Sequence, residues 1–287
     1  MSFHRLAQSV SLCLLLLGLA VGATTDTKLT IVRPTLHEGD DGPPIVTGYR
    51  YMAGDLVFFS FQVSGYKKLG AEPDEKVDVA YEMNVRDSKG VLLDPPNVGS
   101  VGTGVSHEDK DWLPKVRYQF PIPPLADPGE YKISLKLWDR FAKTETSLDV
   151  PFQVAGRVVE PSDTLVVRNF RFLRSEEDKN PLAVAAYRPG DTVWARFDMT
   201  GYKFGPGNQF GVEYDVAVAL ADGTLTYSQP HAAEEKTKTF YPQRYTPGIA
   251  SLNVPPDIKK GEYILIVTVR DTEGSQTAET RQKFTVE

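Results

Sequence analysis

The sequence contains little cysteine, few histidines and no excess of basic residues. Its single cysteine is Cys13, so the chain cannot form an internal disulfide. Asp and Glu number 38 against 32 Lys and Arg, and the formal net charge of −6 leaves no global basic field for nucleic acid or anionic lipid. After residue 23 no stretch reaches the roughly 18 consecutive apolar residues of a transmembrane helix. These absences argue against a nucleic-acid binder, a disulfide-stabilised fold and a membrane span beyond residue 23.

Residues 1–23 have the pattern of a secretory signal peptide. His4 and Arg5 precede an apolar stretch that ends in Val21-Gly22-Ala23, which are small residues of the kind that signal peptidase accepts. We expect cleavage near Ala23 and a secreted or periplasmic protein, and an uncleaved anchor is the alternative. The mature chain then has no cysteine and no Asn-x-Ser/Thr sequon, which favours a bacterial envelope over an animal secretory route.

An internal repeat covers almost the whole of this mature chain. Segments 54–67 and 190–203 share Gly-Asp-x-Val and, at the same spacing, Gly-Tyr-Lys. Segments 123–131 and 255–263 share Pro-Pro followed by Gly-Glu-Tyr. The offset between equivalent residues falls only from 136 to 132, so one unit has been duplicated. A repeat of this length is a domain and not a solenoid unit.

The hydrophobic pattern within each unit has the period of two that is typical of strands. Apolar residues alternate along 57–63 and 131–137, with Lys and Ser between them in the second segment. In the second unit we expect about seven strands, near residues 164–173, 192–200, 210–220, 224–229, 249–254, 262–270 and 277–286. Seven antiparallel strands in about 130 residues predict a two-sheet β-sandwich. We therefore expect an all-β protein with domains at 24–156 and 157–287, joined by a short linker near residues 155–161.

Two further features resemble known β-sandwich families. Tyr131 and Tyr263 each lie two residues after a glycine and open the penultimate strand, which resembles the aromatic residue at this place in immunoglobulin-like domains. The segment Tyr-Arg-Pro-Gly-Asp-Thr-Val at 187–193 is similar to the opening strand of macroglobulin-like domains. The resemblance implies tandem immunoglobulin-like antiparallel β-sandwiches, and it implies little about function.

The mature chain shows no arrangement typical of catalysis or metal binding. His37, His107 and His231 have no partners at metal-ligand spacing, and no Gly-x-Ser-x-Gly elbow occurs. The glycines at 99–104 lack the strand and helix of a phosphate-binding loop, so we interpret that segment as a flexible loop. We expect no catalytic residue, no metal site and no cofactor.

Acidic residues form two clusters, one after the first strand of each unit: Glu38, Asp40 and Asp41, and Glu176, Glu177 and Asp178. Such oxygen-rich clusters can bind calcium, but their spacing matches no defined calcium loop. We interpret them as solvated charge on exposed loops.

Exposed tryptophans are the candidate ligand-binding residues. Trp138 lies on the wetter face of its strand and Trp112 lies in a polar insert, so either can stack on a sugar ring or anchor a protein interface. The alternative, which we favour, is that they cover a neighbouring loop or the adjacent domain. Trp194 takes the place of Phe58 in the repeat, and we expect it to pack. Aromatic residues also lie among cations in the segment 236–245, which we interpret as an edge-strand surface and not as a nucleic-acid site.

The sequence thus supports a non-catalytic module that acts outside the cytoplasm in binding, adhesion or spacing, with an envelope protein or a polysaccharide as partner. The alternative is a carbohydrate-binding accessory protein that uses Trp112 and Trp138. A hydrolase with a site between the domains is the least favoured hypothesis, because no acid/base constellation can be named.

Overall fold

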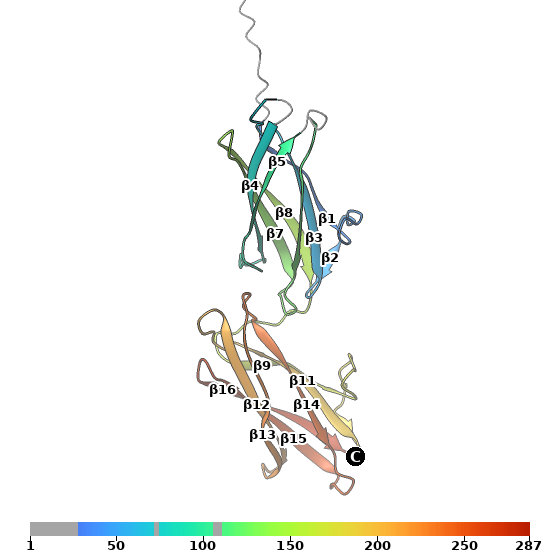
Figure 1. The fold of residues 1–287 in the computed structure, drawn as a ribbon. Coiled ribbons are helices and arrows are strands. Elements are labelled where there is room, and N and C mark those ends of the chain that lie inside the picture. Colours follow the sequence, from blue (N-terminus) through green and yellow to red (C-terminus); the bar gives the residue numbers. More distant parts are fainter. Residues whose placement is uncertain (1–27, 72–74, 106–110) are drawn as a thin grey trace, which may run out of the picture.

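The computed structural model describes residues 28–71, 75–105 and 111–287, which form strands and connecting loops without any helix (Figure 1). Within these residues, no helix is long and apolar enough to cross a membrane. The expected signal peptide and its cleavage point near Ala23 lie outside the described residues, so both stay predictions.

The strands divide into two successive sets, of which the first is β1 (Thr30–His37), β2 (Arg50–Met52), β3 (Leu56–Ser64), β4 (Glu75–Arg86), β5 (Asn97–Val105), β6 (Lys115–Pro121), β7 (Gly129–Asp139) and β8 (Thr144–Ala155). The second set is β9 (Val166–Leu173), β10 (Ala186–Tyr187), β11 (Thr192–Thr200), β12 (Gln209–Leu220), β13 (Leu225–Lys238), β14 (Tyr245–Asn253), β15 (Gly261–Asp271) and β16 (Gln276–Val286). Each of the seven strands expected in the second unit is present, and β10 is an additional short strand.

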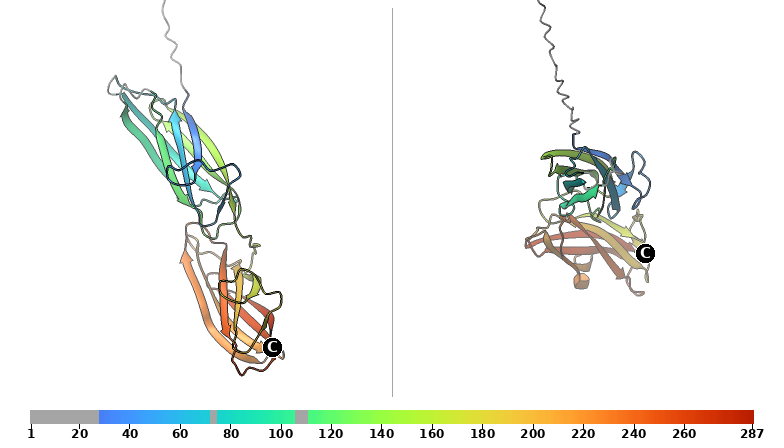
Figure 2. Two further views of the ribbon diagram at one scale, coloured as in Figure 1. Left: turned by 90° about the vertical axis from the view of Figure 1, so that its right-hand side faces the viewer. Right: turned by 45° about the horizontal axis from the view of Figure 1, so that its top comes forward.

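Each set forms a two-sheet sandwich with the same topology. In the first sandwich, a three-stranded sheet of order β1-β3-β6 faces a five-stranded sheet of order β2-β8-β7-β4-β5. In the second sandwich, β9-β11-β14 faces β10-β16-β15-β12-β13, so the strand order is repeated element by element. The predicted all-β, immunoglobulin-like fold is confirmed, and Figures 1 and 2 show the two sandwiches end to end. The domain limits at 156 and 157 stay a prediction.

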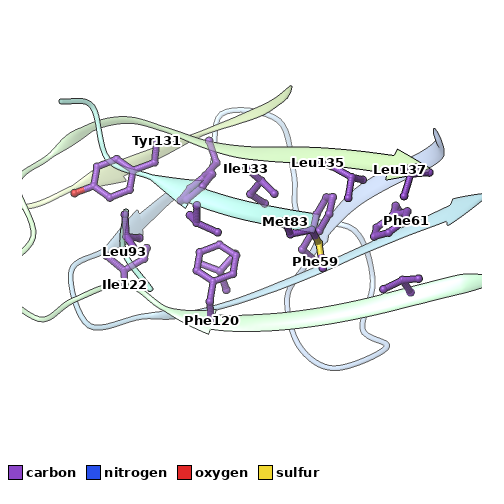
Figure 3. Packing of buried hydrophobic residues seen from close by; sticks show 14 of the residues in the cluster. Phe59, Phe61, Met83, Leu93, Phe120, Ile122, Tyr131, Ile133, Leu135 and Leu137 are labelled. Carbon is purple, nitrogen blue, oxygen red and sulfur yellow. The ribbon is translucent and has the colours of Figure 1, made fainter. Parts of the chain in front are cut away.

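The two cores form because alternate residues of each strand face the opposite sheet. Val57, Phe59, Phe61 and Val63 on β3 are all buried, as the alternation predicts. They pack against the inward face of β7, and Figure 3 shows Phe59 and Phe61 facing Leu135 and Leu137 of that strand. The second sandwich has its own core cluster on β11, β12, β15 and β16. Without disulfides, each sandwich relies on its own core for its stability.

A repeated aspartate fastens two loops at the same place in each sandwich. Asp139 is buried, and its Oδ2 accepts a hydrogen bond from the backbone N–H of Lys67 at 2.6 Å. In the second sandwich, Oδ2 of buried Asp271 accepts from the N–H of Lys203 at 2.9 Å. Each carboxylate thus links the turn after the penultimate strand to the backbone of the Gly-Tyr-Lys segment, at the same place in both sandwiches.

The two tyrosines that carry the resemblance also make equivalent contacts. The hydroxyl of Tyr131 donates to the carbonyl of Asp127, and the hydroxyl of Tyr263 donates to the carbonyl of Lys259, each at 2.6 Å. Both bonds return to the backbone four residues upstream, as in the tyrosine corner of immunoglobulin-like domains.

The expected flexible loop at 99–104 is wrong, because these residues belong to strand β5, which pairs with β4 along its whole length. Backbone pairing at a sheet edge does not require large side chains, so the glycines did not prevent it. A Cβ at Gly99 would meet the ring and hydroxyl of Tyr81, so a larger residue there would require that side chain to shift.

Candidate functional site: the junction of the two sandwiches

The loop between β13 and β14 reaches out of the second sandwich and packs on the end of the first. Its central residue, Tyr241, is 6% exposed, and its ring packs with the core cluster of the first sandwich. The surface that receives it is formed by the turn after β4 and the loop before β7, which carry Asp87 and Asp127. A side chain from one sandwich is therefore buried in the other.

Asp87 is the centre of the polar contacts at this junction, and its side chain is fully buried. Its Oδ1 accepts from the backbone N–H groups of Lys89 at 2.9 Å and Val91 at 2.8 Å. Its Oδ2 accepts from the Tyr241 hydroxyl at 2.9 Å and from the Arg244 guanidinium at 3.1 Å. Oδ1 is thus bonded within the first sandwich by the backbone of its own turn, whereas Oδ2 is bonded by side chains of the second sandwich.

Arg244 binds both acidic residues at once. One of its terminal nitrogens lies 2.8 Å from Oδ2 of Asp127, and the other bonds Asp87. Lys89 also reaches Asp127, with Nζ 2.7 Å from Oδ2, so two cations balance the two carboxylates. Burial opposes the charge on Arg244, but the neighbouring Tyr241, Asp87 and Asp127 raise its pKa above the ordinary value. The guanidinium is therefore charged at every physiological pH.

The phenol of Tyr241 is held in its neutral form. Burial is the main cause that raises its pKa far above the usual value, and the nearby Tyr131 and Asp87 raise it further. A phenol in this state donates a hydrogen bond and cannot act as a base near neutral pH. The junction is chemically a set of mutually satisfied groups, which is suited to joining two bodies and not to proton transfer.

The linker between the sandwiches is also fixed to the second of them. The Arg157 guanidinium forms an ion pair with Asp198 on β11, whose side chain is fully buried, and stacks 5.4 Å from the ring centre of Tyr245. Asn169 donates to the other oxygen of Asp198 at 2.8 Å. Val159 is buried as well. The predicted short linker therefore lies against β11 and does not act as a free hinge.

The two candidate tryptophans, Trp112 and Trp138, do not take part in the junction contacts described above. Trp112 is half-buried against the core of the first sandwich, where its ring lies 6.4 Å from that of Tyr66 in an edge contact. Trp138 is half-buried on the outer face of β7, with Nζ of Lys136 at 5.0 Å from its ring centre. Their role as ligand-binding residues stays a prediction. Trp194 is half-buried, like Phe58 at the equivalent position.

The first acidic cluster is engaged by cations from β6. Asp41 lies 2.9 Å from Nζ of Lys115 and forms an ion pair with Arg117, which also lies 3.5 Å from Asp40. The hydrogen bond from Lys115 is the main cause that lowers the pKa of Asp41. Within the described residues, no three acidic, histidine or cysteine side chains are grouped closely enough to hold a metal ion.

Sequence analysis identified the segment 236–245, which contains Tyr241 and Arg244, but interpreted it as an edge-strand surface and missed the partners of these residues in the first unit. One signal was available in the repeat. At the positions equivalent to Asp87 and Asp127, the second unit has Leu220 and Lys259. Two acidic residues that only one copy carries indicate a surface with a role of its own.

Comparison with known proteins identifies no family for the chain. No family model and no curated protein matches it. A solved structure of the C-terminal domain of the Streptococcus agalactiae AgI/II polypeptide BspA aligns with 90% of this chain and 100% of its own, at 11% identity and a TM-score of 0.28. The C-terminal domain of the Streptococcus pyogenes antigen I/II-family protein AspA aligns with 91% of this chain and 99% of its own, at 10% identity and a TM-score of 0.30. A family 123 glycoside hydrolase from Clostridium perfringens aligns with 40% of this chain and 24% of its own, at 14% identity and a TM-score of 0.28. Alignments with scores this low do not bear on function.

Proposed function

We propose that the chain is a non-catalytic spacer that acts outside the cytoplasm and holds two β-sandwiches in one fixed relative orientation. The observation that carries this proposal is the junction, where Tyr241 of one sandwich is buried in the core of the other and Arg244 joins two carboxylates. Domains joined by a small polar contact normally move relative to each other. A buried aromatic anchor and an ion-paired linker together restrict that motion.

The distribution of distances between the two sandwiches tests this proposal. Spin labels would be attached to Ser147→Cys on β8 and Thr277→Cys on β16, both exposed strand positions, in a Cys13→Ser chain. We expect a single narrow distance distribution from pulsed electron resonance. The distribution should broaden when Arg244→Ala removes both ion pairs, because the buried Asp87 then loses the cation that pairs with it across the junction.

The matched control is Arg281→Ala, which removes an exposed ion pair on β16 far from the junction in sequence. It should leave the distribution narrow. A broad distribution in the parent chain would show that the sandwiches move freely, and the spacer proposal would then be abandoned.

A binding role at the edge of the first sandwich is the second candidate. Among the described strands, β5 pairs only with β4, has no charged residue, and exposes Val98. Such an edge can accept an extended segment of a partner protein, whereas the equivalent strand β13 carries charges and a proline. Capture of envelope proteins by the parent chain but not by Val98→Lys would support this role. Equal capture by both chains would exclude β5 as the binding edge.

Polysaccharide binding through Trp112 and Trp138 is a third proposal. Only the partial exposure of the two indole rings supports it. Retention of the chain on immobilised envelope polysaccharide should fall when both are replaced by alanine, and unchanged retention would remove this proposal.

A further inference from the structure

The second sandwich contains a cavity between its two sheets. The cavity has a volume of about 490 Å³ and opens between the edge strands β13 and β14, near the loop that leads into β15. Its walls come from both sheets and include core residues such as Val193, Val218 and Phe284. Binding sites for small molecules commonly have volumes of about 300–1,000 Å³ and largely apolar walls.

The first sandwich shows what occupies this place when it is closed. Leu93 follows β4 and is buried in the core, and Figure 3 shows it in the same part of that core as Ile122 and Tyr131. The repeat aligns without a gap between Val85 and Val218 and between Gly90 and Gly223, so the counterpart of Leu93 is Thr226.

Thr226 does not close the second sandwich in this way. It is exposed, and its hydroxyl donates to the carbonyl of Val218 at 3.2 Å. The equivalent carbonyl, that of Val85, accepts instead from the backbone N–H of Leu93 at 2.9 Å. In the second sandwich β13 pairs with β12 at this place, with Val218 opposite Tyr227 and a register shift between Val218 and Ala219. Thr226 lies at this shift and provides no buried aliphatic side chain like that of Leu93.

Two more differences between the copies enlarge the cavity. Leu252 and Val254 line it, and their counterparts in the first sandwich are the larger residues Phe120 and Ile122. Ile258 replaces the smaller Ala126 and offsets part of this change. A protein interior normally fills such a space, because an apolar void loses the packing contacts of the atoms that line it.

The polar groups that line the cavity limit the charge and the hydrogen-bonding groups that the head group of a ligand can have. Thr226, Tyr227, Ser251 and Asn253 provide hydroxyl and amide groups. Among the described residues that line the cavity, Asp257 alone is charged. A carboxylate at this place disfavours an anionic ligand and accepts a hydrogen bond from a neutral one.

We propose that this cavity is a binding site for a small aliphatic molecule with an uncharged hydroxyl head group. The aliphatic chain takes the place that Leu93 fills in the first sandwich, and the hydroxyl lies at the mouth with Asp257 and the other polar side chains. The proposal is independent of the spacer role, because the cavity lies within one sandwich and involves no junction residue.

Titration of the full chain with 1-octanol, followed by methyl NMR, tests the site. We expect shifts at the methyl groups of Val193, Leu252 and Ile258 and none at the equivalent Val57 of the first sandwich. Octanoate, which has the same number of carbons and a negative charge, should bind at least about tenfold more weakly. No shift of these methyl groups with octanol, or equal binding of octanoate, would overturn the proposal.

Thr226→Leu copies the closing residue of the first sandwich and should abolish the octanol shifts while the chain stays folded. Val254→Ile, copied from Ile122, is the second blocking variant if Thr226→Leu does not fold. Thr277→Leu, which adds the same side chain to an exposed position on β16, is the matched control and should bind octanol as the parent does. Octanol shifts that persist in the blocking variant would place the ligand elsewhere and overturn the proposal.

Discussion

Replacing Tyr241 with phenylalanine removes the hydroxyl of this side chain from the junction. The ring stays and continues to fill the core of the first sandwich, while the bond from the hydroxyl to Oδ2 of Asp87 is lost, together with the bond that the hydroxyl accepts from Arg244 at 3.2 Å. A hydrogen bond to a charged group contributes about 1.5–3 kcal/mol. Asp87 keeps its bonds to Arg244 and to two backbone N–H groups. We therefore expect a loss near the lower limit, about 1.5 kcal/mol.

The loss should appear in the first sandwich, although the substitution lies in the second. For a unit of roughly 130 residues, about 1.5 kcal/mol corresponds to a decrease in Tm of roughly 5 °C. Calorimetry measures the size of the effect, and hydrogen exchange with mass spectrometry locates it. Amide protection should decrease in β7 (Gly129–Asp139) more than in β15 (Gly261–Asp271).

Tyr263→Phe is the matched control, because it removes a tyrosine hydroxyl whose bond, to the carbonyl of Lys259, stays within the second sandwich. It should decrease protection in β15 and leave β7 unchanged. If Tyr241→Phe instead weakened only β15, the contact across the junction would contribute nothing to the first sandwich, and the reasoning behind the fixed orientation would be refuted.

Three other outcomes follow from the packing and the charges. Gly99→Ala places a Cβ 2.3 Å from the hydroxyl of the facing tyrosine on β4 and should lower the free energy of unfolding by about 1–3 kcal/mol in urea titrations, whereas Gly102→Ala, which has only a backbone oxygen at 3.9 Å, should change it little. Arg157→Ala leaves the fully buried Asp198 without its cation and should cost about 2 kcal/mol, which is less than for a fully buried pair because Arg157 is partly exposed; an unchanged Tm would contradict this. Burial raises the pKa of Tyr131 to about 12, so the stability that its neutral phenol contributes is complete below the unfolded value of about 10 and is lost as the pH rises from there to 12. Because burial also raises the pKa of Tyr51 and Tyr187, the loss between pH 8 and pH 11 is measured by urea titration in the parent and in Tyr131→Phe. The parent should lose more stability, and equal losses would show that the Tyr131 phenol titrates normally.

The sandwiches could be predicted from the sequence because their signals are local. Alternation along β3 and β7 and the turns that the repeat conserves depend on residues close together in the chain. Sequence comparison could detect the repeated Gly-Tyr-Lys segment but not explain its glycine. Gly65 and Gly201 both have positive φ, and a Cβ there would meet the backbone carbonyls of Lys28 and Thr164.

The junction could not be predicted in this way, because its partners are far apart in the chain. Tyr241 and Asp87 are separated by 154 residues, and no local sequence pattern around either residue indicates that it contacts the other. Strand β5 was missed for a different reason. Its pairing uses backbone groups at a sheet edge, where glycines do not carry the hydrophobic alternation on which the prediction rests.

One feature shared by both sandwiches concerns their response to pulling. In each, a short early strand runs parallel to the last strand, as β2 does to β8 and β10 to β16. A pull that draws two parallel neighbours in opposite directions along their length loads their hydrogen bonds in shear. An antiparallel hairpin pulled at its open end gives way one bond at a time. With three residues in β2 and two in β10, each sandwich has one short pair of strands that such a pull would load in shear.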